Sequence, residues 1–431
     1  MIVCKFGGSS VADEDQIKKV KDILESDKER TIAVVSAPGK RNKEDRKVTD
    51  MLLECNALVQ QNKSCRSVFN LIEERFLSIA KALKVNSRKL KAALETVRQK
   101  IDAGAGMDYA ASRGEYLSAL LISEYLGWEF IDSADCIVIN ADGSVNGISY
   151  ERLSNMLLPN GHYVIPGFYG ATVDGVIKTF SRGGSDISGA IAARAAKAKL
   201  YENWTDVSGL FAADPRIVEN AKAVPFMTYN EVRELADVGA SVFHEEAIAP
   251  VIPLSIPINI RNTNSPLDKG TLISASSENK GVVGVSGKGG FSALRLRKLM
   301  MFKRPGMRHA LLTMLHLYGV RPSYSFFGID SIVWLFPSSQ ATDSVLSAMC
   351  DRLKKDFELD SATIERDEAI IGLTAGDMSD GRYVIEAASA LKSAGIKIKL
   401  INYGSSEYTV LFCVSESDCK QAVREIYKAL F

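Results

Sequence analysis

Short apolar runs alternate with helical patterns through the first half of the chain. Residues 1–6 and 31–35 are apolar runs of the length expected for strands. Between them, Asp13 and Gln16 can cap a helix whose apolar positions recur at helical spacing. These apolar positions are Ile17, Val20, Ile23 and Leu24. A strand, a helix and a second strand in this order predict a βαβ unit with parallel strands and a right-handed crossover.

The same alternation returns further along the chain. Apolar runs at 136–140 and 163–166 are expected to be strands, and the alanine-rich segment 186–197 is expected to be a helix. Repeated alternation of this kind is typical of a mostly parallel sheet covered by helices on both faces. The predicted fold class of this part is therefore α/β.

The amino-acid composition of the chain changes at about residue 253. From 253 to 290 Ser, Asn, Lys and Gly become frequent, as in NTNSPLDKG, and this composition predicts a linker. Shorter elements follow it, and a comparable set then recurs. The expected strands are 291–299, 331–336, 368–374, 397–402 and 407–414, and the expected helices are 305–317, 341–355, 382–394 and 416–429. Two α+β units of the β-α-β-β-α-β type, about 70 residues each, fit this tail better than one larger domain.

Length and charge narrow the possible functions. The 431 residues suffice for about three domains at roughly 150 residues each. Apolar residues make up 46% and charged residues 24%, which is ordinary for a globular protein. The 53 basic and 52 acidic residues leave a net charge of +1, so no overall field favours nucleic acid or an anionic membrane. We expect neither as a partner, and any anion site must be local.

The apolar and cysteine patterns predict a cytoplasmic protein. The first apolar run is too short for a signal peptide, and no segment reaches the ~18 uninterrupted apolar residues that a membrane span needs. Seven cysteines are scattered without a C-x-x-C pair, which argues against disulfides and zinc. The four histidines do not pair with other ligands at metal-binding spacing. We therefore expect no protein-bound metal.

Two glycine-containing loops can bind anions. In KFGGSS, Lys5 ends a strand, and Gly7, Gly8 and Ser9 follow it before a helix. Glycines let backbone N–H groups approach phosphate oxygens, and the lysine supplies a point charge. The lysine precedes the glycines, so this is not a Walker A loop. A tight turn with an exposed lysine is the structural alternative.

The second loop is SRGGSD, which opens the alanine-rich helix. Arg182 offers a planar fork for a carboxylate, and Ser185 follows the two glycines. Asp186 is unusual in a purely anion-binding loop. It fits a site in which it orients the lysine or positions a transferring phosphate with its metal, because phosphoryl transfer depends on placement and charge neutralisation. A plain helix-capping role is the alternative.

A third segment, WTDVSGLFAADPR, carries groups suited to a nucleotide. Thr205 and Asp206 offer a hydroxyl and a carboxylate, Phe211 an aromatic face and Arg216 a charge for phosphate. Its Asp-Pro step could equally be an ordinary turn. The elements SRGE and VTD start helical patterns elsewhere and are not informative when taken alone.

Taken together, these motifs resemble the aspartate kinase branch of the amino acid kinase family. The resemblance rests on KFGGSSVAD, VVSAPGK, VTD, SRGEYLSA, PGFYG, SRGGSD and WTDVSGLFAADPR in this order, and it covers nearly the whole chain. It implies a catalytic αβα sandwich over 1–270 and two ferredoxin-like ACT domains over 291–356 and 357–431. The strand at 282–286 is expected to complete the second ACT domain.

The resemblance also assigns site residues. Lys5, Gly7, Gly8 and Ser9 match the phosphate-binding element, and Asp186 matches the catalytic acidic position. The positions that match aspartate contacts are Thr49, Glu115, Phe168, Arg182 and Ser185, with Arg182 on a substrate carboxylate and Glu115 suited to the ammonium group. The positions that match further nucleotide contacts are Thr205, Asp206, Phe211, Arg216 and Ser241. Phe211 stands where relatives often have Tyr, and Ser241 where many have a lysine.

The implied reaction is transfer of the γ-phosphoryl group from ATP, bound with Mg²⁺, to the side chain of L-aspartate. This is the first step toward lysine, diaminopimelate, threonine and methionine, and 431 residues leave no room for an attached homoserine dehydrogenase, so a monofunctional enzyme is expected. A kinase for glutamate or acetylglutamate is an alternative that SRGE and the tail disfavour. An inactive amino-acid sensor is a second alternative, which the retained Lys5, Arg182 and Asp186 disfavour.

The tail implies a homodimer joined through ACT domains and an amino-acid effector. In lysine-inhibited relatives an acidic side chain and a Ser-Glu pair of the first ACT domain hold the effector's ammonium group. A gapless count from Gly306 places these positions on Ser323 and on Gly328-Ile329, so both charges are missing. An unpaired buried ammonium costs several kcal/mol, so weak or absent inhibition by lysine is expected. If the count is misaligned, Asp330 takes the acidic role.

Overall fold

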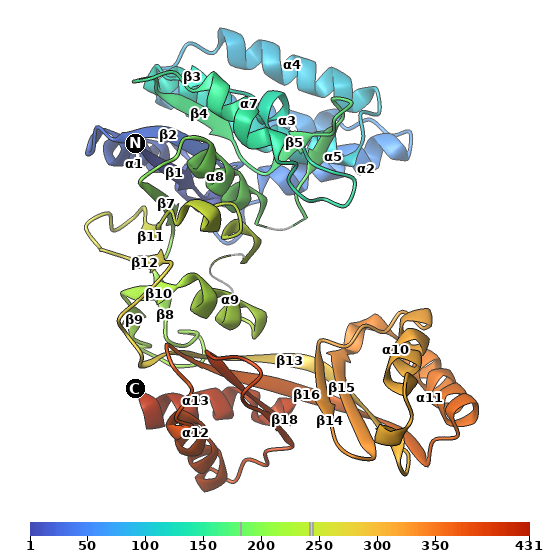
Figure 1. Cartoon of the computed structure of the whole chain (residues 1–431). Coiled ribbons are helices and arrows are strands. Elements are labelled where there is room, and N and C mark those ends of the chain that lie inside the picture. The colour runs from blue at the N-terminus through green and yellow to red at the C-terminus, as the bar shows by residue number, and fades with distance from the viewer. Residues whose placement is uncertain (182, 241–242, 244) are drawn as a thin grey trace. The chain divides into compact units, whose positions relative to one another are not determined.

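A computed structural model describes residues 1–181, 183–240, 243 and 245–431. The described residues form two compact units (Figure 1). The first consists of Met1–Leu210, Ala223–Val232 and Ser241–Glu278, and the second of Phe211–Lys222, Arg233–Ala240 and Asn279–Phe431. The chain therefore enters the second unit twice before its tail begins. Of the nucleotide positions, Phe211 and Arg216 belong to the second unit.

The described part of the first unit is built on an eight-stranded, mostly parallel sheet with the order β10-β12-β11-β7-β1-β2-β4-β3. Its strands are β1 (Ile2–Phe6), β2 (Arg30–Val35), β3 (Glu129–Phe130), β4 (Tyr163–Pro166), β7 (Leu200–Thr205), β10 (Phe226–Thr228), β11 (Ile258–Asn262) and β12 (Thr271–Ser274). A small hairpin of β5 (Tyr169–Ala171) and β6 (Ile177–Thr179) lies outside the sheet. The central pairs β1–β2 and β1–β7 are parallel, as the sequence predicts.

Helices cover the sheet on both faces. They are α1 (Glu14–Glu25), α2 (Val48–Gln60), α3 (Arg66–Ala82), α4 (Arg88–Asp102), α5 (Met107–Leu126), α6 (Ser133–Cys136), α7 (Ile148–Met156) and α8 (Gly184–Ala195), with 3-10 turns η1 (Gly8–Val11), η2 (Glu245–Ala247) and η3 (Ile252–Leu254). Asp13 caps α1 by accepting from the N–H groups of Asp15 and Gln16, as predicted, but the Gln16 side chain donates to Asn264 Oδ1 and does not complete the capping pair.

Alternation along β1 decides which side chains face which helices. Ile2, Cys4 and Phe6 pack in the core formed with α1 to α5. The intervening Val3 and Lys5 therefore point to the opposite face, where α8 packs against β1, β2 and β7. This alternation places Lys5 on the face of the sheet that carries the SRGGSD helix.

Two sequence expectations are wrong. Residues 136–140 are not a strand, because Cys136 ends α6 and Val138 and Ile139 form only isolated bridges. The run is apolar because it is buried, and its backbone bonds to Ala171 and to the Ser149 hydroxyl instead of a sheet neighbour.

The segment 253–290 is not a linker. It contributes β11 and β12 to the sheet and the start of a long strand in the second unit. NTNSPLDKG is polar because it forms the turn between the antiparallel strands β11 and β12, where Asn262 and Ser265 accept turn hydrogen bonds.

The second unit is built on a six-stranded antiparallel sheet, counted over the described residues, with the order β14-β15-β13-β16-β18-β17. Its strands are β13 (Val282–Arg297), β14 (Tyr324–Phe327), β15 (Ser331–Pro337), β16 (Ser361–Ala375), β17 (Leu400–Asn402) and β18 (Thr409–Ser415). Its helices are α10 (Met307–Leu317), α11 (Asp343–Phe357), α12 (Arg382–Ser393) and α13 (Cys419–Leu430), with 3-10 turns η4 (Met301–Lys303), η5 (Ser338–Gln340) and η6 (Glu416–Asp418). The predicted α+β tail is confirmed.

Two long strands connect the halves of this sheet. The first part of β13 pairs with the end of β16, and the last part pairs with both β15 and the start of β16. The predicted strand at 282–286 is thus the beginning of β13, beside the half that contains β18. Separate cores lie under α10 with α11 and under α12 with α13. The domain boundaries 291–356 and 357–431 stay a prediction.

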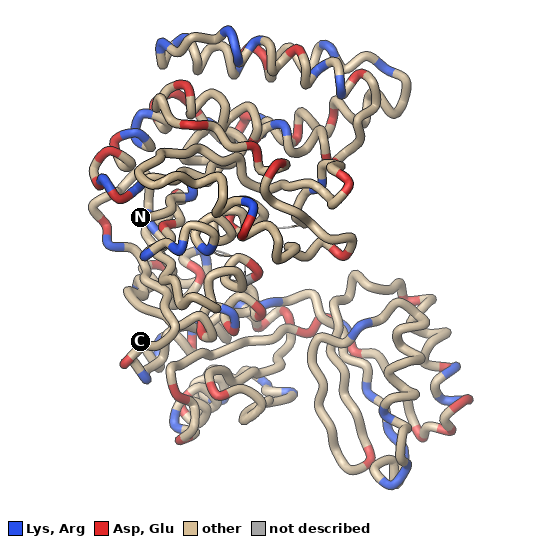
Figure 2. Tube along the Cα trace, turned by 45° about the horizontal axis from the view of Figure 1, so that its top comes forward, with Lys and Arg blue, Asp and Glu red and all other residues tan. Residues whose placement is uncertain are grey.

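The remaining elements are β8 (Leu210–Phe211), β9 (Ala223–Val224) and α9 (Tyr229–Asp237). Acidic and basic residues are interspersed along both units (Figure 2). Among the described residues, no helix is both long enough and apolar enough to cross a membrane.

Candidate active site

Lys5, Asp186 and Asn203 form a polar cluster at one end of the parallel sheet, in which Lys5 and Asn203 are buried and Asp186 is partly exposed. Lys5 lies near the end of β1, and Asn203 is its neighbour in register on β7. Asp186 lies in the first turn of α8. The Nζ of Lys5 is 2.6 Å from Asp186 Oδ1 and donates to Asn203 Oδ1 at 3.4 Å. Asn203 Nδ2 in turn donates to Asp186 Oδ1 at 2.9 Å, so the three side chains close a triangle.

The cluster disagrees with the two structural alternatives for these residues. Lys5 is only 8% exposed, so it is not the exposed lysine of a simple turn. Asp186 follows the N-cap position, which Gly183 occupies, and its carboxylate pairs with Lys5. An ammonium group has three N–H donors, and Asp186 and Asn203 are its partners among the described residues. Lys5 therefore keeps donor capacity for a ligand.

The glycine turn after β1 packs directly against the VVSAPGK loop. Gly7 N–H donates to Trp204 O at 2.9 Å, and Gly39 N–H donates to Gly8 O at 2.8 Å. A Cβ on Gly8 would lie 2.9 Å from Ala37 O, closer than real Cβ atoms approach. Glycine is thus required here by backbone contact, and the turn leaves Ser9 partly exposed.

Glu115 lies on α5 facing the same loop. Its neighbour Gly114 is so close to the loop that a Cβ would lie 2.6 Å from Ala37 Cβ and 3.5 Å from Val48 Cγ1. Glu115 is 6% exposed, and within the described residues its Oε2 has no hydrogen-bond partner. Burial raises the pKa of Glu115 to about 8, and a backbone hydrogen bond from Ala37 only partly offsets this. Thr49, next to Val48, is partly exposed in the first turn of α2.

Phe168 and Ser185 meet at the start of α8. Phe168 has φ of 75°, which is strained for a bulky residue, and its N–H donates to Ser188 Oγ at 3.1 Å. A Cβ on Gly167 would lie 2.7 Å from Ser185 Cβ, so this glycine permits the close approach. Both predicted substrate contacts therefore border the helix that carries Asp186.

The nucleotide positions divide between the units. Thr205 is the last residue of β7, two positions after Asn203. Its hydroxyl donates to Asp206 Oδ1 at 3.1 Å. Phe211 packs against the core of the second unit. Arg216 is largely exposed and pairs with Asp214 at 2.7 Å. Arg182 and Ser241 lie outside the described residues.

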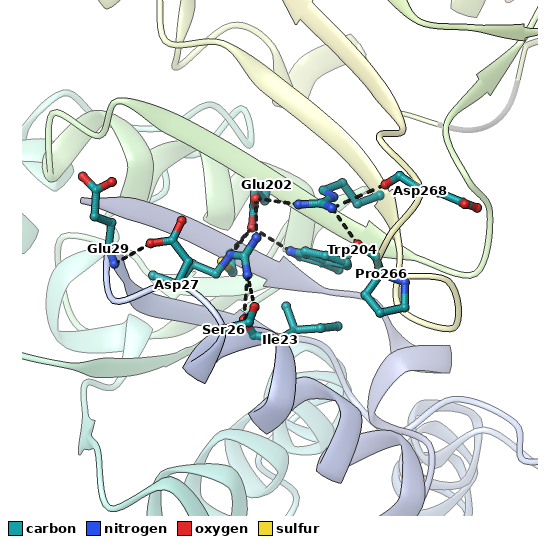
Figure 3. A network of polar contacts seen from close by, with 11 residues as sticks. Ile23, Ser26, Asp27, Glu29, Glu202, Trp204, Pro266 and Asp268 are labelled. Carbon is teal, nitrogen blue, oxygen red and sulfur yellow. Dashed lines mark hydrogen bonds and ion pairs between the residues drawn. The ribbon is translucent and has the colours of Figure 1, made fainter.

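Sequence reasoning did not find Asn203. The signal is available only once the register is known, because Asn203 lies beside Lys5 when β7 pairs with β1. Neighbouring Glu202 points to the other face, into a separate network (Figure 3). It accepts from Arg30 Nε at 2.7 Å, Arg261 Nη1 at 3.3 Å, Trp204 Nε1 at 3.0 Å and Cys4 Sγ at 3.3 Å. No group of three or more potential metal ligands occurs in the part of the chain that the structure describes.

Comparisons with known proteins agree with this architecture. The model of the amino acid kinase family matches residues 1–262, and an ACT domain model matches residues 386–430. Aspartokinase 3 of Bacillus subtilis is 34% identical, with 100% of this chain and 99% of the relative covered.

Solved structures agree as well. Clostridium acetobutylicum aspartate kinase superimposes with a TM-score of 0.92 at 40% identity, covering 100% of both chains. Escherichia coli aspartokinase III in complex with lysine and aspartate superimposes with a TM-score of 0.77 at 25% identity, covering 100% of this chain and 99% of that one. The kinase fold, the ACT-like tail and the full-length likeness place this chain in the amino acid kinase family, among the aspartokinases.

Proposed function

We propose that the Lys5, Asp186 and Asn203 cluster is the phosphoryl-transfer centre of an aspartate kinase. The reaction moves the γ-phosphoryl group of ATP to the side-chain carboxylate of L-aspartate and gives 4-phospho-L-aspartate, the first step toward lysine, diaminopimelate, threonine and methionine. The observation that carries the assignment is the pairing of buried Lys5 with Asp186, 2.6 Å apart, with Lys5 at the end of the strand that leads into the glycine turn.

Lys5 neutralises the charge that spreads over the transferring group, and Asp186 with Asn203 holds the ammonium in place. Phosphoryl transfer needs positioning and charge neutralisation more than covalent chemistry. The attacking carboxylate is ionised at pH 7, so no general base is required. Mg²⁺ enters as part of the Mg-ATP substrate and supplies further charge neutralisation.

The amino acid binds between α5, α2 and the start of α8. Glu115 accepts the ammonium group, since the Oε2 atom of its buried carboxylate has no hydrogen-bond partner among the described residues. Thr49, Phe168 and Ser185 make the further contacts, and Arg182 grips a substrate carboxylate. Arg182→Ala is expected to lower kcat/KM for aspartate by roughly 30-fold to several-thousand-fold and to leave ATP binding nearly intact.

The nucleotide binds over the glycine turn. Backbone N–H groups of Gly7, Gly8 and Ser9 approach phosphate oxygens, as glycine turns before a helix commonly do. The remaining contacts of this proposal are Thr205, Asp206, Phe211, Arg216 and Ser241.

Lys5→Met tests the transfer centre, because it keeps the stem and removes the charge. We expect kcat to fall by about 10³-fold, with a much smaller change in aspartate affinity. Lys18→Met is the control, since Lys18 forms an exposed pair with Asp15. The assay is coupled ADP release with L-aspartate, L-glutamate or no amino acid. A normal kcat in Lys5→Met, or a preference for glutamate, would refute the proposal.

The second unit is proposed to form a homodimer through its ACT domains and to respond weakly or not at all to lysine. Ser323 and Ile329 offer no carboxylate at the aligned positions. Asp330, the other acidic candidate, accepts from Met300 N–H at 2.7 Å and so already has a backbone partner. Titrating lysine, threonine and methionine against ADP release tests this proposal. Half-inhibition by lysine below about 1 mM would contradict it, since a buried ammonium needs a counter-charge.

The proposed location is the cytoplasm. All seven cysteines are buried free thiols, which fits a reducing compartment. Labelling intact and permeabilised cells with a membrane-impermeant lysine reagent would test this location, since lysines such as Lys18 are exposed.

A further inference from the structure

Arg75 is a buried arginine on the otherwise apolar face of α3. Its side chain is 3% exposed, and buried neighbours on the same face include Phe69, Ile72, Phe76 and Ile79. A guanidinium group removed from water must be compensated by hydrogen bonds or counter-charges. The partners of Arg75 therefore indicate why an arginine is present.

Those partners are three backbone carbonyls that belong to two loops. Among the described residues, Arg75 Nη2 donates to Ala12 O at 2.9 Å and to Gly39 O, and Nη1 donates to Arg46 O at 3.0 Å. Asp45 Oδ2 lies 3.4 Å from Nη1 and supplies the counter-charge.

Each of these carbonyls adjoins a proposed contact. Ala12 follows the 3-10 turn that begins at Gly8. Gly39 contacts that turn directly, through its N–H to Gly8 O at 2.8 Å. Arg46 comes just before α2, which carries Thr49 in its first turn.

Beyond Gly39, the other restraints on the loop 36–47 are mostly local polar contacts: Arg41 donates to Asp45, and Arg46 pairs with Glu54. The segment contains no helix or strand among its described residues, and most of it from Lys40 to Lys47 is exposed. Ala37 at the start of the segment is buried, but from Lys40 to Lys47 every side chain is polar, so the hydrophobic core does not hold this part. Arg75, on α3, contacts this segment at the carbonyls of Gly39 and Arg46 and at the carboxylate of Asp45.

We infer that Arg75 is a positioning residue that fixes the phosphate turn after β1 and the start of α2 relative to each other. The inference rests on the proposed roles of Gly7, Gly8, Ser9 and Thr49. The partners of Arg75 are backbone carbonyls and Asp45, so its proposed action on the site is indirect. Without the planar guanidinium, the phosphate turn and the start of α2 are no longer held at a fixed distance, and a misplacement of about 1 Å can lower the rate about 10²-fold.

Arg75→Lys is the main test, because lysine keeps the charge but cannot reach the separate carbonyls with one planar group. We expect kcat/KM for both aspartate and Mg-ATP to fall by about 10²-fold while the variant remains folded. Arg30→Lys is the matched control. Arg30 is also buried, but it binds Ile23, Ser26 and Glu202, which lie outside the site. Its thermal midpoint should fall comparably, with kcat/KM within about twofold of wild type.

Two further readouts separate positioning from simple stability. Trypsin should cleave Arg75→Lys faster than wild type within Lys40–Lys47, whatever the chain catalyses. If Arg75→Ala folds, millimolar guanidinium should restore part of its activity. If Arg75→Ala does not fold, the result for Arg75→Lys decides the test.

The inference would be overturned if Arg75→Lys kept the wild-type kcat/KM. It would also be overturned if Arg75→Lys and Arg30→Lys, compared at equal thermal midpoints, lost the same share of kcat/KM. Failure of the proposed function would look different. In that case Lys5→Met would retain its kcat, while the tryptic cleavage of Arg75→Lys would still increase.

Discussion

Two buried glutamates in the first unit have opposite surroundings. Glu202 is 2% exposed and is bound by Arg30, Arg261, Trp204 and Cys4 (Figure 3). Glu115 is 6% exposed, and its Oε2 has no hydrogen-bond partner among the described residues. Similar burial of the same residue type therefore gives a saturated network in one place and an unfilled acceptor in the other.

The difference distinguishes structural charges from charges that await a ligand. A buried carboxylate with cationic partners holds neighbouring elements together, and its removal leaves those cations unpaired. A buried carboxylate with an unfilled oxygen destabilises the free protein and gains the missing partner when an ammonium group binds. Lys5 and Asp186 are intermediate, because they pair with each other and Lys5 keeps a donor for the phosphoryl group.

The largest expected effect is on the saturated network. Glu202→Gln leaves Arg30 and Arg261 without a counter-charge, so we expect a loss of about 3–5 kcal/mol in the free energy of unfolding. Urea unfolding followed by tryptophan fluorescence measures it, since Trp204 contacts Glu202.

The kcat of the folded Glu202→Gln enzyme should stay within about twofold of wild type. Glu25→Gln is the control, because Glu25 forms an exposed pair with Lys21, and such pairs contribute about 0–1 kcal/mol. A stable but inactive Glu202→Gln would show that the network takes part in catalysis.

Glu115→Gln should do the reverse. Without the charge that receives the ammonium group, kcat/KM for aspartate should fall by roughly 30- to 10³-fold, or about 2–4 kcal/mol. The KM for ATP should stay close to that of wild type, and the protein should be at least as stable at pH 8. Steady-state kinetics with each substrate varied in turn would reveal it; unchanged aspartate kinetics would exclude Glu115 from the substrate site.

The unfilled acceptor of Glu115 should also make the stability of the free protein depend on pH. Burial raises the pKa of Glu115 from 4.5 to about 8, so the folded protein holds this proton to a higher pH than the unfolded chain. The stabilisation is complete below about pH 4.5 and is lost as the pH rises to about 8.

Glu115→Gln does not titrate there. Its free energy of unfolding should therefore increase relative to wild type by on the order of 2 kcal/mol between pH 5 and pH 8. Urea unfolding at several pH values compares the two proteins. Parallel pH profiles would mean that Glu115 is solvated or already paired.

The smallest effect should come from Asn203. Asn203→Ala removes one donor to Asp186 and one acceptor for Lys5 but leaves their ion pair, so we expect about a tenfold lower kcat. Tyr201→Phe is the control, because the Tyr201 hydroxyl donates only to the backbone carbonyl of Asp186. Equal losses in both variants would mean that packing at α8, not the triangle, sets the rate.

The sequence determined the local elements and the reactive residue types. Apolar periodicity located β1, α1, β2, β4 and the helices of the tail, because burial of one face dictates that spacing. The glycines after Lys5 and before Ser185 identified two turns where backbones approach closely. The full-length resemblance gave the family, which the comparisons confirm.

Composition misled where burial and polarity had other causes. Residues 136–140 are apolar without being a strand, and 253–290 is polar although it holds β11 and β12. Ile137 and Ile139 bond to Ala171, and β11 pairs with β7, so local composition could not reveal these distant backbone partners.

Only the tertiary structure decided which residues act together. Strand register brings Asn203 to Lys5 and turns Glu202 to the other face, since side chains alternate along β7. Packing joins Phe211 to the second unit's core and Arg75 to three backbone carbonyls of two loops. The sequence specified the charged groups, but whether each is saturated or free for a ligand depends on partners that lie tens to hundreds of residues away and are brought together by folding.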